Sequence, residues 1–179
     1  MRVMALGVRG SIPVTLPEMQ GVGGATSAVA IARDSEAPSL VLDAGTGLLR
    51  WGRTFGSDPF RGSVILGHVH WDHIIGLPFW PQADREGATA RVLVPQGELA
   101  GPVGNLLRPP SANPGPPDPS GTRSAALAAL DLIMNPPAFP ITADQLRGDL
   151  TFETYGPGVM DVSGWEVTAL EIPHKGGRT

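Results

Sequence analysis

The amino-acid sequence predicts an α/β fold in which short helices are layered against mixed β-sheets. Strand patterns and helical patterns follow one another in mixed order, and the first strands are arranged as a hairpin, so a purely parallel sheet is not expected. The length of 179 residues and the apolar content of 41% suit one domain with a sizeable core. We therefore expect residues 1–179 to form a single domain.

The first strands are predicted from short apolar runs bounded by turn residues. Residues 2–8 have the pattern of a strand, and a loop follows over residues 9–24. Residues 26–32 and 40–42 are the next two strands, and the turn residues at 34–38 between them predict an antiparallel hairpin.

The middle of the chain predicts a buried strand between two short helices. Residues 48–55 can begin a helix after a glycine turn, and residues 63–67 form a continuous apolar run typical of a strand buried on both faces. Residues 74–80 predict one or two helical turns, which Pro78 and Pro81 limit.

The second half contains one segment that cannot pack as regular structure. Residues 101–121 hold seven prolines and four glycines, and we expect them to form a mobile surface loop. A strand is predicted before it, and a helix that starts at Thr122 or Ser124 and extends to Met134 is predicted after it. The three strands expected in this half are residues 90–94, 150–155 and 165–172.

Composition excludes several classes of site. The chain has no cysteine, so disulfides and thiolate metal sites are ruled out. The net charge of −4 gives no basic field for nucleic acid, which we therefore regard as a disfavoured partner. The apolar stretch after Met1 is too short for a signal segment, and no run approaches the ~20 apolar residues of a membrane span. A cytoplasmic protein without a membrane partner is expected.

The segment VILGHVHWDH contains three of the four histidines of the chain. At the end of an extended strand, His68 and His70 would point to the same side, because they are two residues apart. If a helix starts at Ile74, the chain turns and brings Asp72 and His73 back towards that side. A solvated polar turn would explain poorly why an apolar run leads directly into this cluster. We predict a metal site.

The pattern His68-x-His70-x-Asp72-His73 resembles the signature of the metallo-β-lactamase superfamily. Other motifs resemble the branch that contains phosphodiesterase-like, ribonuclease Z-related and phosphonate-pathway hydrolases: GVRGSIP at 7–13, GGATS at 23–27, LDAGTG at 42–47, HWDHIIGLPF at 70–79, PAFP at 137–140, and His174. The resemblance covers nearly the whole chain and is specific for the superfamily but not for a substrate. It implies an αββα sandwich of mixed β-sheets.

The resemblance also implies a role for each candidate residue. His68, His70 and His174 would hold a first metal ion, and Asp72 and His73 would hold a second and act in catalysis. Asp43 would orient the ligand loop by hydrogen bonds. A turn former before a glycine is the alternative for Asp43, and a surface residue is the alternative for His174.

Imidazole and carboxylate ligands suit zinc, with manganese or iron as alternatives, and we expect two ions in a complete site. A metal ion lowers the pKa of bound water strongly, towards ~7. The expected function is therefore hydrolysis of a phosphodiester, with a small-molecule phosphoester as the substrate. A carbon-ester hydrolase of the lactonase or thioesterase type and a non-catalytic remnant are the alternatives.

The resemblance further implies a bridging aspartate and a final histidine beyond His174. No carboxylate side chain follows Glu171 in this sequence. We therefore expect a truncated domain, comprising the N-terminal half to two-thirds of the family fold, in which the second ion is held weakly. One sheet face would then be exposed, and a homodimer would cover it.

Overall fold

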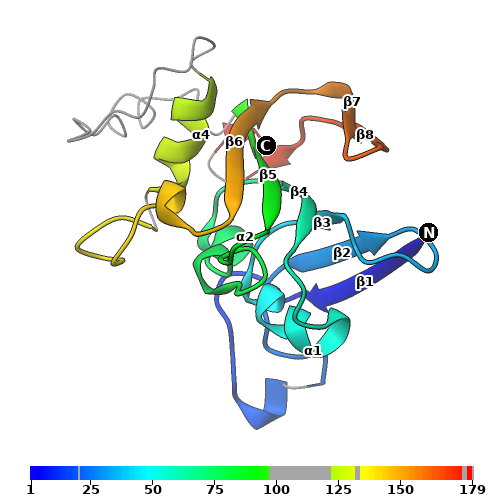
Figure 1. Ribbon diagram of the computed structural model, residues 1–179. Helices are drawn as coiled ribbons and strands as arrows, with labels where there is room; N and C mark the ends of the chain where they lie inside the picture. Colours follow the sequence, from blue (N-terminus) through cyan, green and yellow to red (C-terminus); the bar gives the residue numbers. More distant parts are fainter. Residues whose placement is uncertain (20, 97–121, 132–133, 175–176, 179) are drawn as a thin grey trace.

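The computed structural model of the chain describes residues 1–19, 21–96, 122–131, 134–174 and 177–178. Its centre is a six-stranded sheet whose strands lie in sequence order (Figure 1): β1 (Arg2–Gly7), β2 (Ala28–Ala32), β3 (Leu40–Leu42), β4 (Arg61–Ile65), β5 (Thr89–Pro95) and β6 (Asp149–Tyr155). The pairs β1–β2 and β2–β3 are antiparallel, whereas β3, β4, β5 and β6 are parallel to their neighbours. The predicted α/β class, the mixed sheet and the early hairpin are confirmed.

Short elements surround this sheet. The helical ones are η1 (Pro17–Met19), η2 (Thr46–Arg50), α1 (Trp51–Phe55), α2 (Trp71–Ile74), η3 (Leu77–Phe79), α4 (Thr122–Leu130) and η5 (Ala143–Gln145). Two further sheets have two strands each: β7 (Gly158–Val162) with β8 (Trp165–Ala169), and β9 (Pro173–His174) with β10 (Gly177–Arg178). Within the described ranges, no helix has the length and apolarity needed to cross a membrane.

The register of the parallel strands gives the sheet two apolar faces. Val41, Val64, Val92 and Phe152 are aligned across four strands, and all four belong to the core that includes residues of α1, α2 and α4. The next residues along three of these strands point to the opposite face. On that face, Ile65 and Leu93 pack with residues of β7 and β8.

Three layers result, with helices on one face of the central sheet and the β7–β8 ribbon on the other. Figure 1 shows α4 beside β6 on one side and the ribbon on the other. This arrangement is compatible with part of a metallo-β-lactamase-like sandwich.

The segment of the histidine motif differs from the prediction in where its strand and helix end. Strand β4 ends at Ile65, so that His68 and His70 lie in the loop after the strand rather than at the strand end. The pairing with β3 stops there because the amide of Gly67 donates a hydrogen bond to the Asp43 carboxylate. The prediction of a helix from Ile74 was also wrong, since α2 starts at Trp71. Asp72 therefore lies in the first helical turn, where a carboxylate is stabilised by the helix dipole.

The C-terminal strands were only partly predicted. The strand expected at 165–172 ends at Ala169, and the partner strand β7 was not predicted. The helix α4 ends at Leu130, before the expected Met134. The proline-rich segment 101–121 lies outside the described residues.

Candidate metal centre

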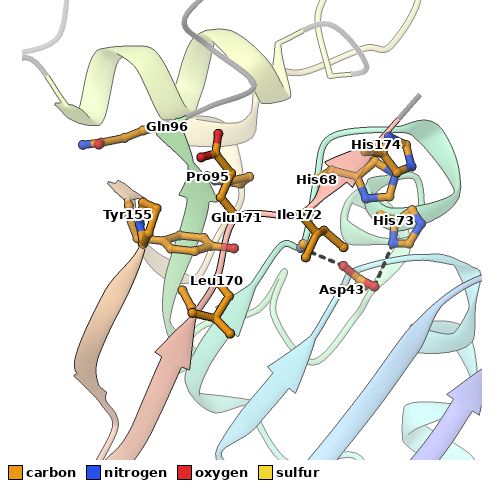
Figure 2. Close-up of a pocket in the computed structure, with 14 residues that line it drawn as sticks. Asp43, His68, His73, Pro95, Gln96, Tyr155, Leu170, Glu171, Ile172 and His174 are labelled. Atoms are coloured by element: carbon orange, nitrogen blue, oxygen red, sulfur yellow. Dashed lines mark hydrogen bonds and ion pairs between the residues drawn. The ribbon is translucent and has the colours of Figure 1, made fainter. Parts of the chain in front are cut away.

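The carboxyl ends of the four parallel strands define one edge of the sheet, and ligands of α/β proteins bind at such edges. Asp43 follows β3, Gly67 and His68 lie just after β4, Gln96 follows β5, and Tyr155 is the last residue of β6. A cavity of about 390 Å³ lies at this edge, and these five residues are among those that line it (Figure 2).

The structure brings His68, His70 and His174 together. One ligand atom of each residue lies within 4.8 Å of those of the other two. The ring centroids are 4.5 Å apart for His68 and His70, 4.4 Å for His68 and His174, and 4.9 Å for His70 and His174. His174 reaches the cluster on β9, more than 100 residues after the other two along the chain.

A second group consists of His68, Asp72 and His73, whose ligand atoms also lie within 4.8 Å of one another. The Nε2 atom of His73 is 3.2 Å from Oδ2 of Asp72. Both side chains are largely buried, with 18% of His73 and 13% of Asp72 exposed. His68 belongs to both groups, so the five side chains expected to bind metal form one continuous cluster.

Asp43 connects the cluster to two other segments of the chain. Its Oδ1 atom accepts a hydrogen bond from the amide of Gly67 at 2.9 Å, and its Oδ2 atom accepts one from the Ser27 hydroxyl at 2.8 Å. The same Oδ2 atom lies 2.7 Å from Nδ1 of His73 (Figure 2). Asp43 itself has a φ of 62°, a left-handed conformation that aspartate tolerates better than most residues. These contacts fix His73 and the start of the histidine loop relative to the sheet.

The carboxylate of Asp72 is held from a different loop. Its Oδ2 atom accepts a hydrogen bond of 2.9 Å from the backbone amide of Ser11. Ser11 has a φ of 69°, and a non-glycine residue with such a conformation costs free energy unless its surroundings require it. The GVRGSIP motif thus contributes a backbone donor to the cluster.

The protonation of His68 favours cation binding. Burial, together with the nearby His73, His70 and His174, lowers the pKa of His68 to about 4. The ring is therefore neutral near pH 7 and keeps a lone pair for a ligand, because a metal ion requires the neutral imidazole.

The contact between Asp43 and His73 shifts the pKa of both groups. Burial alone would raise the pKa of Asp43, but hydrogen bonds from His73, Gly67 and Ser27 outweigh it and lower that pKa below 3.8. Burial alone would lower the pKa of His73, but Asp43 and Asp72 outweigh it and raise that pKa above 6.5. Asp43 therefore remains an anion at neutral pH and holds the Nδ1 proton of His73.

The residues present fit a metal ion of the zinc class. The donors are imidazole nitrogens and a carboxylate oxygen, which zinc, manganese and iron all accept. The donors also have oriented partners behind them, since Asp43 contacts His73 and the Ser11 amide contacts Asp72. Such outer contacts are typical of metal sites in proteins.

Three residues at the site were not predicted from the sequence. Ser27 and Ser11 lie within motifs that carried the resemblance, and that position in the motifs was the only signal for them. Tyr155, whose hydroxyl donates a 2.7 Å hydrogen bond to the carbonyl of Leu66, had no signal, because 89 residues separate the two.

Two curated proteins are similar to this chain along almost its whole length. Ribonuclease Z of Haloarcula marismortui is 28% identical over 98% of this chain, and ribonuclease Z of Natronomonas pharaonis is 27% identical over 97% of it. In each case the alignment covers 44% of the relative, so the chain spans less than half the length of the relatives it matches. No family model and no solved structure matches the chain.

The names of both relatives agree with the branch that the sequence motifs indicated. The chain resembles the ribonuclease Z-related branch of the metallo-β-lactamase superfamily, as its sequence motifs predicted.

Proposed function

We propose that this chain provides the metal-binding part of a hydrolase that cleaves phosphodiester bonds in RNA. The observation that carries the proposal is the joined cluster of His68, His70, His174, Asp72 and His73 at the carboxyl edge of the sheet. Two overlapping groups of ligand atoms with a shared histidine suit two neighbouring cations. Two-cation sites are a common means of phosphodiester cleavage.

His68, His70 and His174 would hold one zinc ion, and Asp72 and His73 would contribute to a second. When bound, zinc supplies an activated water near neutral pH and stabilises charge on the phosphoryl oxygens. Asp43 keeps a proton on Nδ1 of His73, which leaves Nε2 facing Asp72 and the cluster. The Ser11 amide holds one oxygen of Asp72 and so orients its carboxylate.

As the substrate, RNA is favoured over the small-molecule phosphoester that we expected from the sequence. Both similar proteins are named as ribonucleases. A net charge of −4 weakens long-range attraction for RNA, but cations in the cluster would offset that charge where the phosphate binds.

The proposal is tested with the purified chain loaded with zinc. Zinc per chain is measured by elemental analysis, and hydrolysis is measured on bis(p-nitrophenyl) phosphate and on a short single-stranded RNA. We expect bound zinc and hydrolysis of both substrates. His68→Ala removes the ligand that both groups share and is expected to lower the rate by more than ~100-fold, since even the loss of an outer contact costs about 10–100-fold.

Asp72→Asn has a matched control in Asp149→Asn, since Asp149 is exposed at the opposite end of the sheet, where β6 begins. Asp72→Asn should lower activity and zinc content, and Asp149→Asn should change neither. Zinc-loaded chain that cleaves no phosphodiester, but cleaves a lactone or thioester, would establish the carbon-ester alternative instead. Absence of bound zinc despite supplementation would contradict the proposal and favour a non-catalytic remnant.

A further inference from the structure

The cavity beside the histidine cluster has two chemically different ends. One end is formed by Asp43, His68, His73 and His174, which belong to the candidate metal centre or support it. The other end is mainly apolar, with walls that include Pro95, Pro157, Leu170, Ile172 and the ring of Tyr155 (Figure 2). A molecule bound at the cluster therefore has an apolar surface next to it.

The apolar wall includes large side chains that the core does not bury. Leu170 is 76% exposed and Ile172 is 57% exposed, although both line the cavity. They lie in the segment between β8 and β9 that carries His174 to the cluster. The same short segment thus supplies a candidate metal ligand and part of the apolar wall.

The aromatic part of the wall is held rigidly. The hydroxyl of Tyr155 donates to the carbonyl of Leu66, two residues before His68. This bond fixes the ring beside the cluster. A fixed aromatic ring is a suitable surface for an unpaired base, because every base has a π-face that can stack on it.

The size and the charge of the cavity favour one nucleotide over a longer strand. Its volume of about 390 Å³ is at the lower end of ligand sites, which measure ~300–1,000 Å³. Among the residues that the structure describes, those that line the cavity include Glu171 but no lysine or arginine. A second or third phosphate would therefore meet no lysine or arginine among the described lining residues.

We propose that the apolar end of the cavity binds the base of one terminal nucleotide, whose phosphate lies at the histidine cluster. The inference rests on the proposed function and gives it a specificity: cleavage next to an unpaired terminal nucleotide. The base contacts the apolar wall and the Tyr155 ring, and the phosphate is the only charged group of the ligand that enters the site.

The experiment compares two probes that differ only in the base, adenosine 5′-monophosphate and ribose 5-phosphate. Both are titrated into the zinc-loaded chain in a calorimeter. We expect adenosine 5′-monophosphate to bind about tenfold more tightly, because its base buries apolar surface against Leu170, Ile172 and the Tyr155 ring. The double substitution Leu170→Ser and Ile172→Ser should reduce this ratio to less than about threefold without changing the zinc content.

Val159→Ser is the matched control, because Val159 is an apolar residue of β7 that is 68% exposed and does not line the cavity. It should keep the preference for the probe with the base. Equal affinity of the wild-type chain for both probes would overturn the inference, and so would a preference that survives the double substitution.

Hydrolysis of a methyl ester of ribose 5-phosphate separates this inference from the proposed function. Equal binding of the two probes, with hydrolysis of this base-free diester intact, would refute the base site alone. Base-dependent binding without hydrolysis of any phosphodiester would support the base site and refute the proposed function.

Discussion

At the level of single residues, the cluster depends on contacts made outside the histidine motif. Asp43 joins Ser27, Gly67 and His73 through three polar contacts of 2.7–2.9 Å. Ser27 lies just before β2, whereas Gly67 and His73 are near the two ends of the segment 67–73 that carries the histidines. Their convergence on one carboxylate explains why a loop without regular structure can still present its histidines in a defined arrangement.

Tyr155 allows a direct test of this environment, because it is the only tyrosine in the chain. Burial, followed by the nearby Asp43, raises the pKa of Tyr155 to about 12. Ultraviolet titration should therefore show tyrosinate formation with a midpoint near 12 instead of 10. The folded state prefers the neutral phenol, so this group's contribution to stability is lost as pH rises through the interval between those values.

Tyr155→Phe keeps the ring and removes the hydrogen bond to Leu66. It should lower the free energy of unfolding by about 1 kcal/mol and abolish the titration. A midpoint near the ordinary value in the wild-type protein would mean that the phenol is not buried.

Asp131, directly after α4, is expected to destabilise the protein at neutral pH. Burial, followed by the negative charge of Asp144, raises its pKa to about 6. Its Oδ1 atom is buried and has no hydrogen-bond partner among the described residues. The raised pKa favours the protonated form in the folded state, so stability should fall as pH rises from 3.8 to about 6.

Asp131→Asn should therefore raise the free energy of unfolding near pH 7 by about 1 kcal/mol. This is less than the full pKa difference would give, because solvent screens the charge of a partly exposed side chain. The difference between the two proteins should disappear below the unfolded-state pKa of the aspartate. Urea unfolding at several pH values measures this dependence. A difference that does not vary with pH would point to a cause other than ionisation.

The members of the cluster could be predicted because its five candidate metal ligands are histidines and an aspartate, four of them within one recognisable motif. Tyr155 and the Ser11 amide could not be predicted from local pattern. Their contacts depend on which strands end at the same edge and on a left-handed backbone conformation, and no spacing in the sequence encodes either feature.

At the level of elements, Gly45 and Gly76 allow the loop after β3 to pack closely against residues 72–76. The amide of Gly76 donates to the carbonyl of Ala44, and the amide of Ala44 donates to the carbonyl of His73. A Cβ atom on Gly76 would lie 1.9 Å from the Gly45 carbonyl oxygen, which leaves no room for any side chain. The motifs LDAGTG and HWDHIIGLPF therefore fit together through their glycines.

Gly76→Ala should destabilise the protein by roughly 3 kcal/mol, because the contacting atom is backbone and cannot move independently. Gly21→Ala is the matched control, since a Cβ atom there would meet nothing within 4 Å. Thermal unfolding of both variants checks the expectation. Equal melting temperatures for the two variants would show that the two loops do not approach as closely as described.

Element types were easier to predict than element ends. The continuous apolar run at 63–67 correctly indicated β4, whose last three residues are all buried. The predicted end of β4 was two residues too late, from 67 − 65, because the Asp43 carboxylate accepts a hydrogen bond from the Gly67 amide that would continue the strand. The helix α2 starts three residues before the predicted position, from 74 − 71. The short β7 strand, which contains Asp161, lacks a run long enough to be recognised.

At the level of the whole molecule, a metal ion would connect distant parts of the chain and should stabilise the fold. With free zinc at about 100 times its dissociation constant, the free energy of unfolding should rise by ~2.7 kcal/mol. Urea unfolding with zinc and with a chelator measures this change. The His174→Ala variant should lose most of this stabilisation by zinc, whereas the Asp149→Asn variant should keep it. If zinc does not change the free energy of unfolding of the wild-type protein, no ion is bound.

A homodimer remains a prediction. Val3 on the edge strand β1 is 58% exposed, and Val159 on β7 is 68% exposed, so apolar surface is available for a second copy. Light scattering should give about 37 kDa, twice the 18.7 kDa of one chain. Val3→Lys should lower that mass, because a charge on an edge strand opposes pairing; a wild-type mass of one chain would refute the dimer.

His174 follows His73 by 101 residues, from 174 − 73. The cluster is therefore synthesised in two stages, with His174 added long after the other members. At ~5–20 residues per second, a ribosome would need roughly 5–20 s to add the last histidine after the first three. During that interval the nascent chain already carries three imidazoles and one carboxylate within six positions. The nascent chain therefore has the groups to bind zinc before it can fold. Zinc that also binds the unfolded chain stabilises the folded state less, so the increase in the free energy of unfolding measured at equilibrium would be smaller.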